Sequence, residues 1–131
     1  MGFTVARHTA MARRAYETSA KSTGTPRSVE YQLFSRLTGA LTTAEDNKSE
    51  NYLSYVNALS RNLEFWTIIG ADVSSDDNAL PAALRGQIFY LFEFTQQHTQ
   101  RILSGDKTIN AEPLIDINRN VMSGLNAFGG E

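Results

Sequence analysis

The sequence predicts an all-α protein, and three observations support this class. Apolar residues recur at steps of three and four along most of the chain, which is the spacing of one face of a helix. No segment alternates apolar and polar residues over the length of a strand. The chain has 131 residues and no cysteine, so it suits one domain without disulfides or cysteine-ligated zinc. We expect an antiparallel bundle of four main helices, preceded by a loosely packed N-terminal helix.

The first main helix is predicted to run from about Pro26 to Glu45. Thr25 is a suitable N-cap, and Pro26 fits the first turn, where its missing N–H costs nothing. The predicted apolar stripe of this helix consists of Val29, Leu33, Leu37, Ala40, Leu41 and Ala44.

The second main helix is predicted to begin after Ser49, which can cap it, and to end at Gly70. Glycine is favoured just after the last helical residue, because it adopts the left-handed conformation without strain. The predicted stripe of this helix consists of Tyr52, Val56, Leu59, Leu63, Trp66 and Ile69.

Two further helices complete the predicted bundle. Asn78 is a reasonable cap for the third, Pro81 is tolerated in its first turn, and Gly105 closes it. The fourth follows Pro113, with a stripe that ends at Leu125. Short connections between these helices favour antiparallel neighbours.

Charge divides the chain into two parts. The net charge is −2, yet residues 1–27 hold five basic side chains against one acidic side chain, which leaves the remainder at −6. We therefore expect residues 1–24 to form a basic arm with helical tendency and residues 25–131 to form the helical bundle domain. No apolar stretch approaches the roughly 20 residues of a membrane span, and no secretory signal is visible. These observations predict a cytoplasmic protein without membrane insertion.

No catalytic, metal or cofactor site is predicted. The sequence has neither a glycine-rich phosphate loop nor a nucleophile elbow. Its two histidines, His8 and His98, are interpreted as solvated polar residues. The acidic residues Asp72, Asp76 and Asp77 lack the ligand spacing of a calcium loop and are better explained by capping of the third helix. A non-enzymatic protein is expected.

The third predicted helix has an unusually wide apolar arc of about 260°, where a surface helix needs little more than 100°. One interpretation is a central helix that is buried nearly all round. The other is that Phe89, Tyr90 and Phe94, at the edges of the arc, line a groove for an amphipathic helix of a partner.

The basic arm suggests an alternative partner, RNA. Its basic side chains could contact phosphates, and Tyr16 could stack on a base. The basic residues concerned are Arg7, Arg13, Arg14 and Lys21. They form a thin patch, and the acidic remainder of the chain would repel a nucleic acid.

Three sets of short motifs, in chain order, carry a resemblance to a known family. The first set is Ala15-Tyr16, Thr25-Pro26-Arg27, Glu30-Tyr31 and Leu33-Phe34. The second set is Asn62-Leu63 with Trp66, followed by Leu80-Pro81, Leu84-Arg85 and Ile88. The third set is Pro113 through Arg119 with Met122 and Gly124-Leu125. Together they resemble the FlaF family of small bacterial flagellar regulators.

The resemblance implies a non-enzymatic factor that promotes flagellin synthesis after transcription, opposes the regulator FlbT, and binds flagellin before export. The terminal segments of flagellin are disordered before assembly and form amphipathic helices in the filament, so a helical bundle is a sensible holder. Within the matching motifs, Arg27 with Glu30 and Asn118 with Arg119 either stabilise their helices or recognise a partner, such as flagellin or a FlbT-like regulator.

Overall fold

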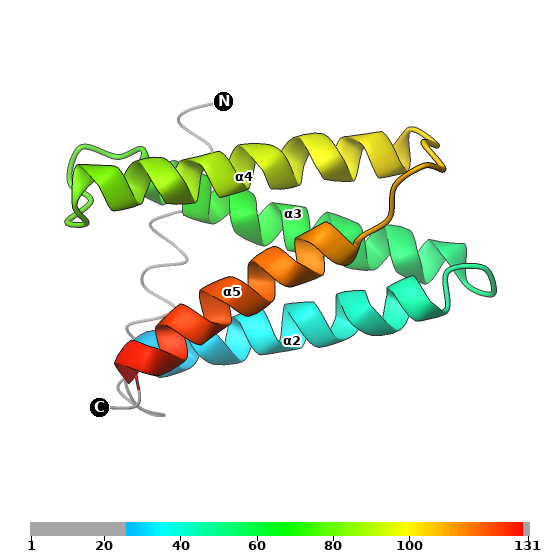
Figure 1. Cartoon of the computed structure of the whole chain (residues 1–131), viewed down its shortest axis with the longest axis horizontal. Coiled ribbons are helices and arrows are strands. Elements are labelled where there is room, and N and C mark those ends of the chain that lie inside the picture. Colours follow the sequence, from blue (N-terminus) through cyan, green and yellow to red (C-terminus); the bar gives the residue numbers. More distant parts are fainter. Residues whose placement is uncertain (1–25, 130–131) are drawn as a thin grey trace.

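A computed structural model of the chain describes residues 26–129. Over this range the protein contains four helices and no strand, which confirms the predicted all-α class (Figure 1). The helices are α2 (Pro26–Asp46), α3 (Tyr52–Val73), α4 (Ala82–Leu103) and α5 (Glu112–Gly129). The predicted basic arm, residues 1–24, lies outside the described range.

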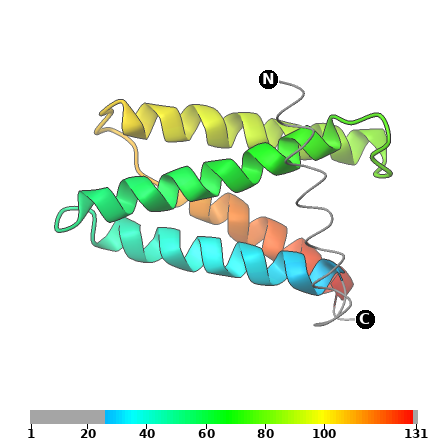
Figure 2. The same ribbon diagram turned by 180° about the vertical axis from the view of Figure 1, so that it is seen from behind.

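The helices are arranged as two neighbouring pairs. α2 packs against α5, α3 packs against α4, and α2 also packs against α3. α4 and α5 approach each other at the end where their loop joins them and diverge toward the other end (Figures 1 and 2). α4 is therefore covered by α3 along its length but by α5 at one end only.

The start of α3 differs from the prediction. Asn51, rather than Ser49, is the N-cap residue, and its side chain accepts a hydrogen bond from the backbone N–H of Ser54 at 3.1 Å. Both residue types can cap a helix. The tight turn that follows α2 decides between them, because the backbone N–H groups of Glu50 and Asn51 both donate to the carbonyl of Asn47.

The start of α4 also differs from the prediction. Pro81 occupies the N-cap position and makes no side-chain capping bond. The side-chain Oδ1 of Asn78 instead accepts a hydrogen bond from the backbone N–H of Leu80, two residues later, at 3.0 Å. This bond closes an Asx-type turn before the helix. The predicted end of this helix is confirmed, because Gly105 follows it with a φ of 100°, a conformation that favours glycine.

Gly70 does not end α3, which continues to Val73. It is buried inside the helix, where a Cβ atom would lie 2.7 Å from ring carbons of Phe92 on α4. The residue is needed for the close approach of two helices, and the prediction of a helix terminus at Gly70 is wrong.

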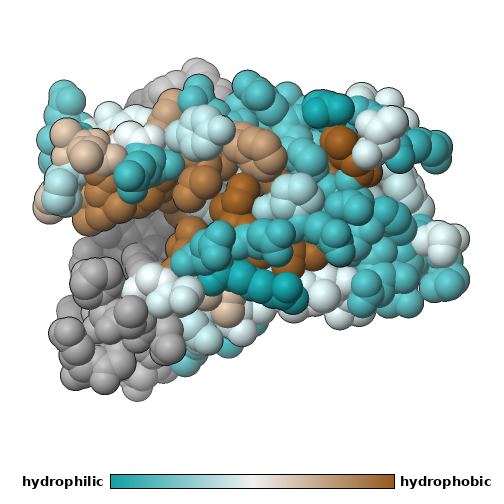
Figure 3. Space-filling model, viewed as in Figure 1, coloured by the Kyte–Doolittle hydropathy of each residue, from teal (hydrophilic) through white to brown (hydrophobic). Residues whose placement is uncertain are grey.

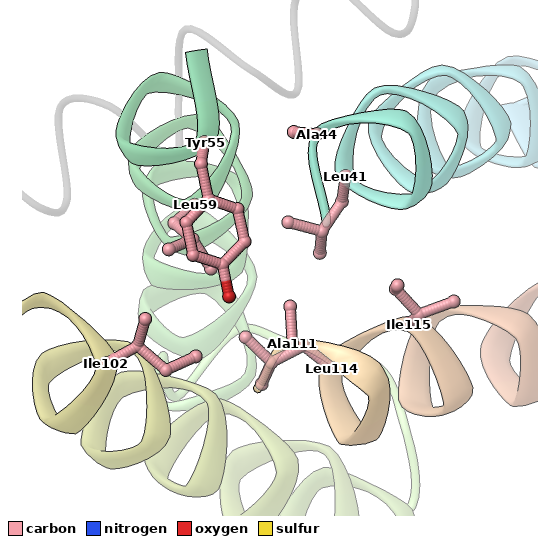
Figure 4. Close-up of a cluster of buried hydrophobic side chains, with 8 residues drawn as sticks. All are labelled: Leu41, Ala44, Tyr55, Leu59, Ile102, Ala111, Leu114 and Ile115. Carbon is pink, nitrogen blue, oxygen red and sulfur yellow. The ribbon is translucent and has the colours of Figure 1, made fainter. Parts of the chain in front are cut away.

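The main hydrophobic core lies where all four helices converge (Figure 4). Its buried members are Leu41, Ala44, Tyr55, Leu59, Ile102, Ala111, Leu114 and Ile115. The predicted stripe of α3 is correct at Leu59 and Trp66, which are buried. Its other members are displaced from the buried face, since Tyr52 is 52% exposed whereas Tyr55 is 2% exposed.

A second apolar contact joins α2 to α3 nearer the diverging end. Phe34 is buried and makes edge contacts with the rings of Phe65 and Trp66, at centroid distances of 5.1 and 5.8 Å. The predicted stripe on α2 is rotated relative to this buried face, because Phe34 and Thr38 are buried while Ala40 is exposed.

Candidate partner-binding face of α4

One side of α4 carries a continuous stripe at helical spacing, and the fold covers only part of it. The stripe consists of Leu84, Ile88, Leu91, Thr95, His98, Thr99 and Ile102. Its last four members are buried. Its first three are not, with Leu84 41% exposed and Ile88 and Leu91 partly exposed. We call the residues Leu84, Ile88 and Leu91 the open face.

The distribution of polarity along the stripe is the reverse of what burial favours. The buried half contains two threonines and a histidine, whereas the open face is entirely aliphatic. Removing apolar surface from water contributes roughly 25 cal/mol per Å². The described helices therefore leave partly uncovered the part of α4 that would gain most from a partner.

The divergence of α5 is the structural cause of the open face. Figure 3 shows hydrophobic surface over the N-terminal half of α4, on the side that looks toward α5. α3 still supports this half from another side, through the contact of Gly70 with Phe92. The loop after α3 also contacts it, because Arg85 donates to the carbonyl of Ser75. The open face is thus presented by an anchored helix, although no neighbour covers it among the described residues.

The predicted site residues Phe89, Tyr90 and Phe94 do not form one surface. Tyr90 is 64% exposed. Phe89 is partly buried, with its ring 5.5 Å from that of Phe92. Phe94 packs against the hydrophobic core. Of the three, only Tyr90 is exposed, and it lies about 100° round the helix from Leu91, outside the open face.

The interpretation of α4 as a helix buried nearly all round is wrong for its N-terminal half. The apolar arc predicted for this helix includes Leu84, Ile88 and Leu91, whereas the predicted site residues lie at the edges of that arc. The signal that could have located the open face is the switch along the stripe from aliphatic residues to Thr95 and His98.

His98 is buried, so its interpretation as a solvated residue is wrong. Its ring stacks on Phe94 at a centroid distance of 5.3 Å, and Nε2 lies 2.6 Å from the backbone carbonyl of Asn110. With the proton on Nε2, the ring donates to that carbonyl and ties α4 to the loop that leads into α5. His8 lies outside the described residues.

Asn118 is fully buried and serves inside the fold. Its Oδ1 accepts from the indole Nε1 of Trp66 at 2.9 Å, and its Nδ2 donates to Oδ1 of Asn62 at 2.8 Å. These two bonds connect α5 to α3, which are not packed against each other along their backbones. Arg119, the next residue, is exposed.

The remaining predicted contact residues lie outside what the structure describes. The side chains of Arg27 and Glu30 are outside it, although their backbone belongs to α2. The arm residues proposed for RNA contact are outside it as well, namely Arg7, Arg13, Arg14, Tyr16 and Lys21.

Glu45, in the last turn of α2, links this helix to Tyr55 on α3 and to Ala111, the residue before α5. Its Oε1 accepts from the hydroxyl of Tyr55 at 2.8 Å and from the backbone N–H of Ala111 at 3.0 Å. Its Oε2 lies 2.5 Å from Nζ of Lys48. Burial by itself raises the pKa of Glu45, but the hydrogen bonds from Lys48, Ala111 and Tyr55 outweigh it and hold that pKa below its ordinary value. Burial, together with the hydrogen bond to Glu45, raises the pKa of Tyr55.

Other kinds of site find no support in the described part of the chain. Residues 26–129 contain no group of three or more His, Asp or Glu side chains able to hold a metal ion. None of the described helices has the length and apolar character required to cross a bilayer. In the turn before α4, the hydroxyl of Ser75 donates to Asp77, and Asn78 bonds to the backbone.

Comparison with known proteins gives one match. A family model described as "Flagellar protein FlaF" matches residues 12–125. No curated protein and no solved structure matches the chain significantly.

Proposed function

Because the chain belongs to the FlaF family of flagellar proteins, we propose that it is a non-enzymatic regulator that promotes flagellin synthesis and export by binding flagellin as a cytoplasmic chaperone. The observation that carries the proposal is the open face of α4. An aliphatic strip on an anchored helix suits the apolar side of an amphipathic helix, which is the form that flagellin termini adopt on assembly. A FlbT-like regulator is a further proposed partner for the same protein.

The geometry of the open face supports helix-in-groove binding. Its residues repeat at steps of three and four along α4, so a partner helix laid beside them would present side chains at the matching spacing. Leu80, 37% exposed, lies two residues before the first residue of α4 and adds exposed apolar surface near that end of the helix. A partner segment that is unfolded beforehand must offset its ordering entropy, so moderate affinity is expected.

Calorimetric titration of the full chain with flagellin monomer tests this proposal. We expect binding in the micromolar range. The substitution Leu84→Asp places a charge on the open face and should weaken binding at least tenfold, while the helical circular dichroism signal stays unchanged because Leu84 is exposed.

The matched control is Leu53→Asp. Leu53 is 71% exposed at the start of α3, and the length of that helix, roughly 30 Å, separates it from the open face. The control should bind flagellin like the unsubstituted protein. Absence of binding by the unsubstituted protein at tens of micromolar would refute the chaperone proposal, and equal weakening by both substitutions would refute the assignment of the face.

A further inference from the structure

The buried half of the α4 stripe and the neighbouring part of α3 contain polar groups without a hydrogen-bond partner among the described residues. Thr95 Oγ1 and Thr99 Oγ1 on α4, and Asn62 Nδ2 on α3, are buried without a hydrogen-bond partner, and all three residues are 0% exposed. Leaving one such group unpaired costs about 1–3 kcal/mol. Three together call for an explanation.

The orientation of the Asn62 amide is determined by Trp66, acting through Asn118. The indole N–H of Trp66 can only donate, so Asn118 must turn its Oδ1 toward Trp66 and its Nδ2 toward Asn62. Asn62 must then present its Oδ1 to Asn118. Its own Nδ2, with two N–H donors, is left facing away from this relay.

Helix register places the unpaired threonines opposite this amide. Gly70 of α3 lies against Phe92 of α4, and the two helices run in opposite directions (Figure 1). Stepping eight residues back from Gly70 to Asn62 corresponds to stepping eight residues forward from Phe92, to the neighbour of Thr99. Thr95 lies one turn earlier on the same face of α4.

The three groups are complementary to one water molecule. A water oxygen can accept from Nδ2 of Asn62, and its two hydrogens can be donated to the hydroxyl oxygens of Thr95 and Thr99. Buried waters typically make about three hydrogen bonds, and globular proteins hold about one per 27 residues.

We propose that α3 and α4 enclose a binding site for one ordered water molecule, held by Asn62, Thr95 and Thr99. The site extends the Trp66–Asn118–Asn62 relay from α5 through α3 to α4. The site accounts for the polar residues in the buried half of the α4 stripe. There α4 is held to α3 by hydrogen bonds through the water, and not by apolar contact alone.

A high-resolution crystal structure of the full chain tests the site directly. We expect a water within about 2.7–3.2 Å of Asn62 Nδ2 and of both threonine hydroxyls. Ordered side chains without such a water would overturn the proposal, as would direct bonding of Asn62 Nδ2 to either hydroxyl.

The isosteric substitutions Thr95→Val and Thr99→Val give a second test, which is decided by the sign of the change in Tm. If the water is present, each change removes one of its partners, and the Tm should fall by about 2–5 °C. If the hydroxyls have no partner, deleting them removes a desolvation cost and the Tm should rise. Thr42→Val is the control, because the hydroxyl of Thr42 already bonds to the carbonyl of Thr38. The proposal requires both the water and the fall in Tm, and a rise in Tm overturns it.

Discussion

The ring of Phe92 on α4 lies so close to the backbone of Gly70 on α3 that a Cβ atom at Gly70 would be 2.7 Å from two ring carbons. A rigid ring held between helices cannot move aside as the end of a flexible side chain can. The contact therefore sets the spacing of α3 and α4 beside the open face.

Substitution of Gly70 by alanine should destabilise the protein. Alanine gains about 1 kcal/mol in helix propensity, but the steric clash with Phe92 should outweigh this gain and leave a net loss of about 1–3 kcal/mol. Urea unfolding, followed by the fluorescence of Trp66, the single tryptophan, measures the change.

Gly39→Ala is the control for this experiment. Gly39 lies within α2, and a Cβ atom there would meet nothing within 4 Å. This variant should be stabilised by about 0.5–1 kcal/mol. Equal stabilisation by Gly70→Ala would show that the Phe92 ring can move aside, and would contradict the predicted steric clash.

Replacing Asn118 with alanine should cost about 2–4 kcal/mol of unfolding free energy. The change removes the acceptor of the Trp66 indole and the donor to Asn62, and both remaining groups are buried. Asn120→Ala, on the exposed side of the same helix, should alter stability by less than about 0.5 kcal/mol. Similar losses in the two variants would mean that the buried hydrogen bonds of Asn118 do not account for the cost of its replacement.

Glu45 should make stability depend on acid pH. Because its pKa is lowered in the folded protein, the stabilisation is fully present above its unfolded value of about 4.5 and is lost as pH falls through the lower folded value. Glu45→Gln removes the charge and should cost about 1–2 kcal/mol at pH 7.

Thermal unfolding of both proteins between neutral pH and about pH 3 checks the sign of this effect. The stability difference between the unsubstituted protein and Glu45→Gln should shrink as pH falls below 4.5, the ordinary pKa of this carboxyl. A difference that stays constant over the whole range would mean that the Glu45 charge does not contribute.

Charge reversal in the arm separates the two partner hypotheses. If RNA contact uses the arm, the double substitution Arg13→Glu, Arg14→Glu should abolish a gel shift with the flagellin leader RNA, because phosphate contacts depend on basic side chains. Flagellin binding through the open face should change by less than about twofold. An unchanged gel shift, or none with either protein, would remove the arm from RNA recognition.

The existence and approximate extent of the helices could be predicted because apolar spacing is a local property. The caps could be predicted less well, since Ser49 and Asn51 are both suitable and the hydrogen bonds of the preceding turn select Asn51. The role of Gly70 could not be predicted, because its constraint comes from Phe92, far away in the sequence. A buried glycine and a terminal glycine look alike in one sequence.

The candidate site could be predicted only as far as its helix. The wide apolar arc of α4 indicated an unusual helix, but the choice of Phe94 placed part of the site in the core. Which part of an apolar arc is uncovered depends on the path of a neighbour, here α5, and no residue of α4 specifies that path.

By itself, the sequence determined an all-α chain with four main helices, an uneven charge distribution, and motifs that resemble the FlaF family, because helix spacing, charge and motifs reside in neighbouring residues. The tertiary structure alone decided that His98 and Asn118 are buried and that the other described helices leave Leu84, Ile88 and Leu91 partly uncovered. The physical reason is that burial and exposure follow from how helix pairs diverge, which is set by packing between residues distant in the chain.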